Sequence, residues 1–183
     1  MKILSASKNC KLIDPETPIS PAFRECVDVW YDLRDGAEQP VWRIDHLMMF
    51  PPPLVPYANV TRWEPAISDH RFIFWGSGRT DMMNFNYTSR PLKELQPAVY
   101  ADLVRSELVE VLAAGVPMKS TAKVRLSDGT TTKVDKVRLP FRDGEGELTT
   151  VLSFDDVEQF LKRYYLSWAR PMSGERQNEK VEG

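Results

Sequence analysis

The chain of 183 residues is long enough to fill one hydrophobic core, because chains of roughly 150 residues bury about two-thirds of their unfolded surface on folding. Its 24 lysines and arginines nearly balance its 26 aspartates and glutamates and give a formal net charge of -2. This balance argues against a general nucleic-acid-binding protein, since binding of DNA or RNA depends on a basic field. The two cysteines, Cys10 and Cys26, form no C-x-x-C pair. Neither a zinc site nor a disulfide scaffold is therefore indicated, and a reducing cytoplasm is the expected location.

Residues 1–21 are predicted to form a proline-containing extension. The apolar pair Ile3-Leu4 is followed directly by polar residues and is too short for a signal peptide. No apolar run approaches the roughly 20 residues that a membrane-spanning helix needs. Prolines discourage helix before Pro21, a residue that is itself favoured in the first turn of a helix.

An amphipathic helix is predicted from Ala22 to Gly36. Its apolar residues recur at helical spacing and are Phe23, Cys26, Val27, Trp30 and Leu33. This stripe must cover a core or a partner, because an isolated helix of this length is only marginally stable in water. The following residues, 37–58, contain five prolines together with apolar side chains. An extended segment that wraps the domain is expected there.

Strands are predicted on both sides of a helical region. Residues 59–64 and 71–75 have the β-branched and aromatic composition of two strands with a turn between them. Short helical segments follow, and then a longer helix at 97–115 that ends in Gly-Val-Pro. Three further strands, at 118–126, 131–141 and 148–154, are joined by Asp-Gly turns typical of hairpins. This order predicts an α+β fold with helices on one face of an antiparallel sheet.

A last amphipathic helix is predicted to begin at Asp155, with Glu158 completing a capping-box-like pattern. Its apolar side chains follow the most regular helical spacing in the chain: Val157, Phe160, Leu161, Tyr164, Tyr165 and Trp168. The polar tail beyond Arg170 is expected to be disordered.

The stretch FIFWGSGRTDMMNFNYTSRPLKEL, residues 72–95, resembles the bacterial stand-alone PAS family, found largely in alphaproteobacteria. In that family a strand ends in Gly-Thr and leads to Gly-x-Asp-Leu-Thr-Gly-Arg-x-Leu. With Gly76 on the family glycine, residues 88–92 fall on Thr-Gly-Arg-x-Leu without a gap. Asn84 and Ser89 stand where the family has glycine.

Two further stretches are similar to the same family. WYDLR at 30–34, followed by QPVWRID at 39–45, resembles its entry region, and VRLPF at 137–141 resembles its Leu-Pro-Leu strand. The resemblance covers residues 22–156, which the prediction takes as the domain, and leaves a C-terminal helix and tail at 157–183. It implies a PAS-like five-stranded antiparallel sheet with short helices on one face, flanked by N-terminal and C-terminal amphipathic helices.

The strand at 71–75 runs into Gly76-Ser-Gly78, which could be the start of a phosphate-binding loop. A dinucleotide loop needs a third glycine where Asp81 stands, and the chain has no Gly-Lys-Ser or Gly-Lys-Thr. The two glycines are better interpreted as a strand exit that needs unusual backbone angles and room.

No catalytic or metal site is indicated by the residues. His46 and His70 are the only histidines, and neither stands among clustered Cys, Asp or Glu residues. No Ser-His-Asp, Gly-x-Ser-x-Gly or His-Glu-x-x-His pattern is legible. The PAS resemblance implies two checks on cofactors: residues 84–88 lack the reactive Cys of a flavin photoadduct, and residues 97–115 lack the His of a haem ligand. Both cofactors are disfavoured, and the identity of any other is left open.

Aromatic and methionine side chains are predicted to converge between the sheet and the helices. The candidate pocket residues are Phe72, Phe74, Trp75, Met82, Met83, Phe85, Tyr87 and Tyr100. Most would be core, but Met-rich surroundings adapt readily, and the resemblance implies a site for a small apolar ligand or for none. The candidate interface residues, on the first and last helices, are Phe23, Val27, Trp30, Phe160, Tyr164 and Trp168.

The leading hypothesis is a bacterial PAS-like sensory or regulatory protein that forms a homodimer and acts on a protein partner, with no nucleic acid, no membrane span and no catalysis. No kinase, cyclase or helix-turn-helix output module is legible in the sequence. Two alternatives stay open: a carrier of a small ligand or cofactor, and a small α+β enzyme with a buried acid or base facing the pocket.

Overall fold

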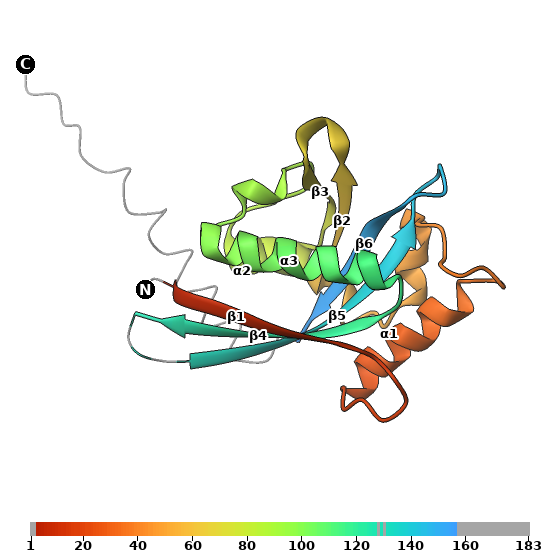
Figure 1. The fold of residues 1–183 in the computed structure, drawn as a ribbon, viewed down its shortest axis with the longest axis horizontal. Coiled ribbons are helices and arrows are strands. Elements are labelled where there is room, and N and C mark those ends of the chain that lie inside the picture. Colours follow the sequence, from red (N-terminus) through yellow and green to blue (C-terminus); the bar gives the residue numbers. More distant parts are fainter. Residues whose placement is uncertain (1–2, 128, 130, 157–183) are drawn as a thin grey trace, which may run out of the picture.

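The computed structural model describes residues 3–127, 129 and 131–156. In this part of the chain six strands form one antiparallel sheet in the order β1-β4-β5-β6-β2-β3 (Figure 1). The strands are β1 (Ile3–Leu12), β2 (Ala58–Glu64), β3 (Asp69–Trp75), β4 (Met118–Leu126), β5 (Thr131–Arg142) and β6 (Leu148–Asp155). The α-helices are α1 (Pro21–Asp32), α2 (Ser77–Met83) and α3 (Ala98–Ala114), and the 3-10 helices are η1 (Ile44–Met49), η2 (Val55–Tyr57), η3 (Pro65–Ile67) and η4 (Leu92–Glu94).

The predicted α+β fold is confirmed, with α2, η4 and α3 between the strand pair β2–β3 and the run β4–β6. The predicted number of five strands is wrong, because β1 pairs antiparallel with β4 along the sheet edge. A signal for β1 was present: Leu4, Ala6, Cys10 and Leu12 alternate with polar residues, and only Lys8 interrupts the pattern. The prolines that follow β1 concealed this pattern. The domain limits drawn at 22 and 156 stay a prediction.

Both faces of the sheet are covered, because successive side chains of a strand point to opposite faces. In β5, Val137 and Leu139 belong to the apolar cluster that contains α1 and residues 42–50. Val134 belongs to the other cluster, which contains α3, and Lys136 and Arg138 also face α3. In Figure 1, α3 lies across one side of the sheet. Helix α1 lies apart from α3, near the end of β1 and the beginning of β4.

Helix α1 places its apolar stripe in the core. Ser20 caps the helix by accepting a hydrogen bond from the Phe23 amide at 3.2 Å. The Trp30 indole N–H donates to the Pro140 carbonyl at 2.6 Å and fixes the helix on β5. Phe23, Val27 and Trp30, predicted as interface residues, are all buried in the sheet-facing cluster. Helix α1 would therefore have to leave the sheet before these three side chains could meet a partner, and their role in an interface stays a prediction.

The corner at Gly76 is set by space. A Cβ at Gly76 would lie 2.2 Å from the Pro56 carbonyl oxygen, and one at Gly78 would lie 2.6 Å from the Tyr57 ring. Gly76 itself has φ of -62°, so the expected backbone room is confirmed there and the expected unusual angle is wrong. The unusual angles fall on Asn84 and Ser89, with φ of 51° and 66°. These are the two positions at which the resembling family has glycine.

The last predicted helix falls on residues 157–183, outside the described part of the chain, and so do Phe160, Tyr164 and Trp168. No helix within residues 3–127 and 131–156 is long and apolar enough to cross a membrane.

Gly76→Ala is expected to lower the free energy of unfolding by about 3 kcal/mol, because the methyl group has to displace the backbone at Pro56. Gly144→Ala is the matched control, since its Cβ would meet nothing within 4 Å and its φ is not positive. Urea unfolding of both variants checks the difference. Equal stabilities for the two variants would contradict the steric explanation.

Candidate functional site

A cavity of about 20 Å³ lies between the sheet and helices α2 and α3. Four of the predicted pocket residues line it: Phe72, Trp75, Met83 and Tyr100. The strands position Phe72 and Trp75 on the face toward α3, because both lie in the cluster that contains that helix. A cavity needs about 10–15 Å³ to hold one water molecule. The enclosed space therefore fits one small group.

The other four predicted pocket residues do not line the cavity. Met82 and Tyr87 are buried in the same cluster, and the Tyr87 ring lies 5.0 Å from that of Trp75. Phe85 is 39% exposed and packs its ring on Tyr87 at 4.7 Å. Phe74 packs with the cluster on the opposite face of the sheet. The predicted set thus divides between cavity wall, core and surface.

Charged residues that the sequence analysis missed fill the rest of this interior. Glu107, at the middle of α3, is fully buried and pairs with Lys136 at 3.0 Å and with Arg138. The Ser120 hydroxyl of β4 donates a hydrogen bond to the same carboxylate. Arg138 also donates to the Ser153 hydroxyl of β6 at 2.6 Å. One carboxylate thus connects α3 to two neighbouring strands, and its arginine partner reaches a third.

A second buried ion pair lies in the wall of the cavity. Arg79 of α2 lies 2.6 Å from Asp155, the last residue of β6, and both side chains are almost fully buried. The Arg79 guanidinium also stacks over the Trp75 ring at 5.1 Å and donates to the Tyr57 carbonyl. Arg79, Arg138 and Asp155 all line the cavity. Its wall therefore includes charged side chains beside the predicted aromatic and methionine residues.

The two buried carboxylates are held in their ionised form. Burial alone would raise the pKa of Glu107, but the charges of Lys136 and Arg138 and the Ser120 hydrogen bond outweigh it and lower the pKa to about 2. Burial likewise opposes ionisation of Asp155, and Arg79 with Lys136 and Arg138 lowers its pKa below the ordinary value. Both groups therefore carry a full negative charge at neutral pH.

Ion pairs join five buried charged side chains at this site. Arg79, Lys136 and Arg138 supply three positive charges, and Glu107 and Asp155 supply two negative ones. The five side chains together carry a net charge of +1. Lys136 also lies 5.0 Å from the centre of the Tyr100 ring, which attracts a cation without neutralising it.

Two N–H groups at the cavity have no hydrogen-bond partner among the described residues. They are the Trp75 indole Nε1 and the Arg138 Nε, and both residues line the cavity. Trp75 is 6% exposed and Arg138 is 2% exposed, so water outside the protein cannot satisfy these groups. Buried donors without a partner are uncommon and costly.

Alternation explains why these charges were missed. Lys136 and Arg138 alternate with Val137 and Leu139, which is the pattern of a strand with one solvated face. Glu107 is one charge among the apolar residues of α3, and a single charge there is typical of the solvated side of an amphipathic helix. A buried charge can be recognised in a sequence only together with its partner of opposite charge. The partners here lie 29 and 31 positions apart along the chain, so local patterns do not show the pairs.

No protein-family model and no curated protein matches the chain. Among solved structures, the chain is similar to an RNA-binding light-oxygen-voltage receptor, with 12% identity and a TM-score of 0.43 over 92% of this chain and 43% of that one. It is similar to the light-oxygen-voltage domain of Aureochrome1 in its dark structure, with 12% identity and a TM-score of 0.41 over 73% of this chain and 96% of that one.

A third similar structure is the PAS domain of a protein from Colwellia psychrerythraea, with 11% identity and a TM-score of 0.38 over 55% of this chain and 85% of that one. The chain thus spans less than half the length of the RNA-binding receptor. At these identities and TM-scores the likeness carries no information about ligand or partner.

Glu107→Gln is expected to lower the free energy of unfolding by about 3–5 kcal/mol, because it leaves Lys136 and Arg138 buried without their counter-charge. Glu110→Gln on the same helix is the control. Its carboxylate is about half exposed and forms a surface ion pair with Lys8, so the loss should stay near about 0–1 kcal/mol. Denaturant midpoints of the two variants measure the difference, and a small loss for Glu107→Gln would contradict the assigned pairing.

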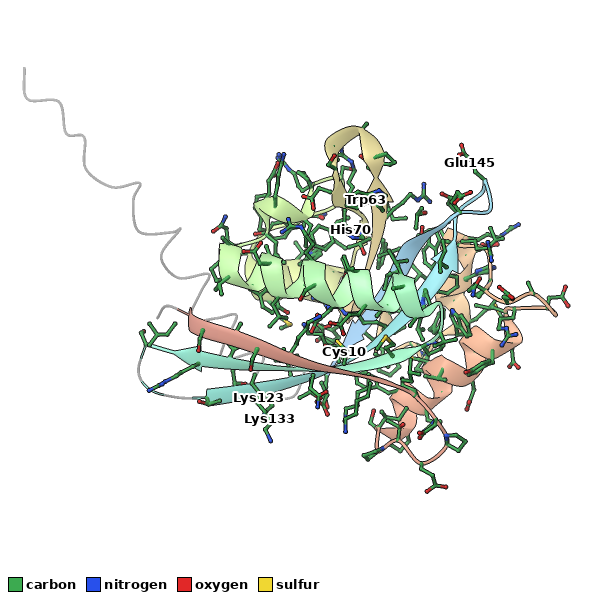
Figure 2. The ribbon with its side chains drawn as sticks, viewed as in Figure 1. Cys10, Trp63, His70, Lys123, Lys133 and Glu145 are labelled. Atoms are coloured by element: carbon green, nitrogen blue, oxygen red, sulfur yellow. The ribbon has the colours of Figure 1, made fainter. Side chains whose placement is uncertain are left out.

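His70 should make the fold sensitive to mild acid. Its side chain is buried beside Trp63, with ring centroids 5.3 Å apart (Figure 2). Burial lowers the pKa of His70 to about 4, and the charges of Arg105 and Arg138 act in the same direction against the opposing charge of Asp69. Between pH 6.5 and 4 the unfolded chain therefore binds a proton that the folded chain does not bind.

The stabilising effect of neutral His70 is complete above pH 6.5 and is lost as the pH falls to 4, by about 3 kcal/mol in all. Free energies of unfolding at pH 7 and pH 4.5 measure this loss. His70→Phe should reduce the difference between the two values, and His46→Gln should change it less, because His46 is only partly buried. An unchanged difference in His70→Phe would contradict the assignment.

Proposed function

We propose that this chain is a PAS-like sensory or regulatory domain that changes its contacts with a protein partner. The observation that supports this proposal is the buried Arg79–Asp155 ion pair at 2.6 Å. One member lines the cavity from helix α2, and the other is the last residue of β6 and also lines the cavity. Whatever alters the charges around the cavity therefore acts directly on the point at which the chain leaves the sheet.

The next residue after β6 is also fixed to the sheet. The Asp156 amide donates to the Asp135 carbonyl at 2.8 Å. The sequence beyond it carries the amphipathic pattern at 157–168. Two peptide bonds separate Asp155 from this segment. A rearrangement of Asp155 would therefore be transmitted directly to a surface that a partner could bind.

The geometry favours regulation over catalysis. A general acid or base works best when its pKa lies near the operating pH. The pKa of Glu107 is lowered to about 2, and that of Asp155 is also lowered. Both carboxylates are already occupied by cations, and the space of about 20 Å³ beside them fits one small group. These properties suit a structural ion network better than an active site.

A carrier of a large cofactor is favoured less. Pockets for drug-sized ligands and cofactors usually measure about 300–1,000 Å³, and the cavity here measures about 20 Å³. A flavin or a haem would have to displace Trp75, Tyr100 and Met83 from the packed wall.

The partner surface is proposed to include a second copy of the chain. Phe23, Val27 and Trp30 are buried on the face of α1 that packs on the sheet, which leaves the C-terminal residues Phe160, Tyr164 and Trp168 as the candidate interface. Large apolar residues repeated at helical spacing gain most when they are covered by another apolar surface.

The full chain is expected to have a mass in solution of twice its 21.0 kDa. Replacing Phe160, Tyr164 and Trp168 together by Ser should give a monomer, because the apolar contact area is lost. The control replaces three exposed apolar residues of the described part by Ser: Ile44, Met48 and Val109. Light scattering after size-exclusion chromatography measures the masses. A wild-type monomer, or a dimer broken only by the control, would contradict the proposed interface.

A further inference from the structure

We infer that one side of the sheet binds the same side of a second copy of the chain, so that helix α1 of each copy lies on a basic strand surface of the other. The inference adds a charged contact in the described part of the chain to the homodimer proposed above, and it rests on that homodimer. Three observations support it: a basic surface on β1, β4 and β5, an acidic surface on α1, and the position of both on one side of the sheet.

The basic surface lies on the side of the sheet away from α3. Lys136 of β5 pairs with Glu107 of α3, so Lys133, an odd number of positions away, points to the opposite side. Lys123 of β4 stands directly opposite Lys133 in the register of the two strands. Figure 2 shows both lysines on the side of the strands away from α3. The other cations of this surface are Lys11, Lys119 and Arg125.

The register of the strands brings like charges together on this surface. Lysines directly opposite one another destabilise a sheet, and Lys123 and Lys133 form such a pair. Lys11 and Lys119 form a second one, which Asp135 relieves through an ion pair with Lys119 at 2.9 Å. Lys123 and Lys133 are exposed and form no ion pair with any described residue. Carboxylates supplied by a partner would remove this repulsion.

Helix α1 presents carboxylates on the side opposite its buried stripe. Glu25, Asp28 and Asp32 are exposed and recur at spacings of three and four residues, which places them on one face of the helix. Among the described residues, none of the three has an ion-pair partner. The buried stripe holds the helix on the sheet, so the acidic face points outward, toward anything that approaches this side.

A groove of about 430 Å³ lies beside the acidic face. Ile13 and Val27 line it with apolar side chains, and Asp14 and Asp28 add carboxylates. Arg24 also lines it, but its guanidinium already donates to backbone carbonyls of the preceding segment at 2.8 and 3.1 Å. A lysine suits such a groove, because its apolar stem can lie on the apolar side chains while its ammonium group reaches the carboxylates.

The position of the two surfaces favours a closed dimer. Val137 and Leu139 of β5 pack in the cluster that contains α1, and Lys133 points to the same side as Val137. A two-fold rotation can therefore place α1 of each copy on the strand surface of the other, and the assembly closes at two copies. The lengths agree: the 12 residues of α1 extend over about 18 Å, and β4 from Lys119 to Arg125 extends over about 20 Å.

The test measures the dissociation constant of the dimer of the full chain by sedimentation equilibrium. Raising the salt from about 0.01 M to about 1 M should weaken the wild-type dimer at least about tenfold, because salt screens exposed charges. This measurement needs no variant. A dimer whose dissociation constant does not change with salt would contradict the inference.

Two variants reverse the charge of one surface each: Lys123→Glu with Lys133→Glu, and Asp28→Lys with Asp32→Lys. Each variant alone should dimerise at least about tenfold more weakly than the wild type at low salt, since like charges then face each other. An equimolar mixture of the two should form a heterodimer of nearly wild-type strength, because opposite charges meet again at both contacts. Lys93→Glu and Glu145→Lys are the controls. Both residues are exposed and lie on neither surface, so these variants should dimerise like the wild type.

Dimers of equal strength in the wild type and in both charge-reversed variants, or a mixture that forms no heterodimer, would overturn the inference. The proposed C-terminal interface would then stand on its own if replacement of Phe160, Tyr164 and Trp168 by Ser still gave a monomer. A wild-type chain that stays monomeric at low salt would refute both the charged contact and the proposed homodimer.

Discussion

The position of α3 depends on one buried carboxylate. Glu107 has no access to water, so its charge is stable only where Lys136, Arg138 and Ser120 surround it. Apolar contacts between a helix and a sheet tolerate small shifts and rotations, whereas a buried ion pair does not. A shift of α3 by one turn, about 5.4 Å, would break both ion pairs. The network therefore specifies one placement of the helix, and the apolar cluster packs around it.

The same network changes the character of the interior. The aromatic and methionine residues of β3 and α2 form walls on two sides, as their sequence suggested. Arg79 and Asp155 complete the enclosure with charge, and Arg79 stacks on Trp75 while it pairs with Asp155. The aromatic ring thus supports the ion pair, and the expected apolar pocket becomes a small cavity with both apolar and charged walls.

The sequence predicted most of the fold because its turn residues and its spacing of apolar residues indicated the same helices and strands. Asp-Gly turns marked the hairpins of β4 to β6, and the spacing in α1 marked its buried face. Asn84 and Ser89, which depart from the glycines of the resembling family, keep the left-handed backbone angle. Asparagine adopts this angle readily, but serine does so at a cost. The turn is thus imposed by its surroundings, including the hydrogen bond from the Ser89 amide to the Phe72 carbonyl at 2.7 Å.

The charged interior was beyond sequence reasoning for a different reason. A charge on a strand predicts a solvated face unless its partner is known, and the partner of Lys136 lies on a helix 29 residues away. Lys8 likewise interrupts the alternation of β1, and its side chain pairs with Glu110 of helix α3. In both cases the charged residue owes its place to a long-range contact that local sequence patterns do not show.

The cavity also lies against the end of β6. Asp155 lines it together with Arg79 and Arg138, and these cations lower the pKa of its carboxyl group against the effect of burial. The ordinary register of β6 extends to that residue through its pairing with Lys136. The end of the strand is consequently held both by its pairing in the sheet and by the ion pair to Arg79 of α2.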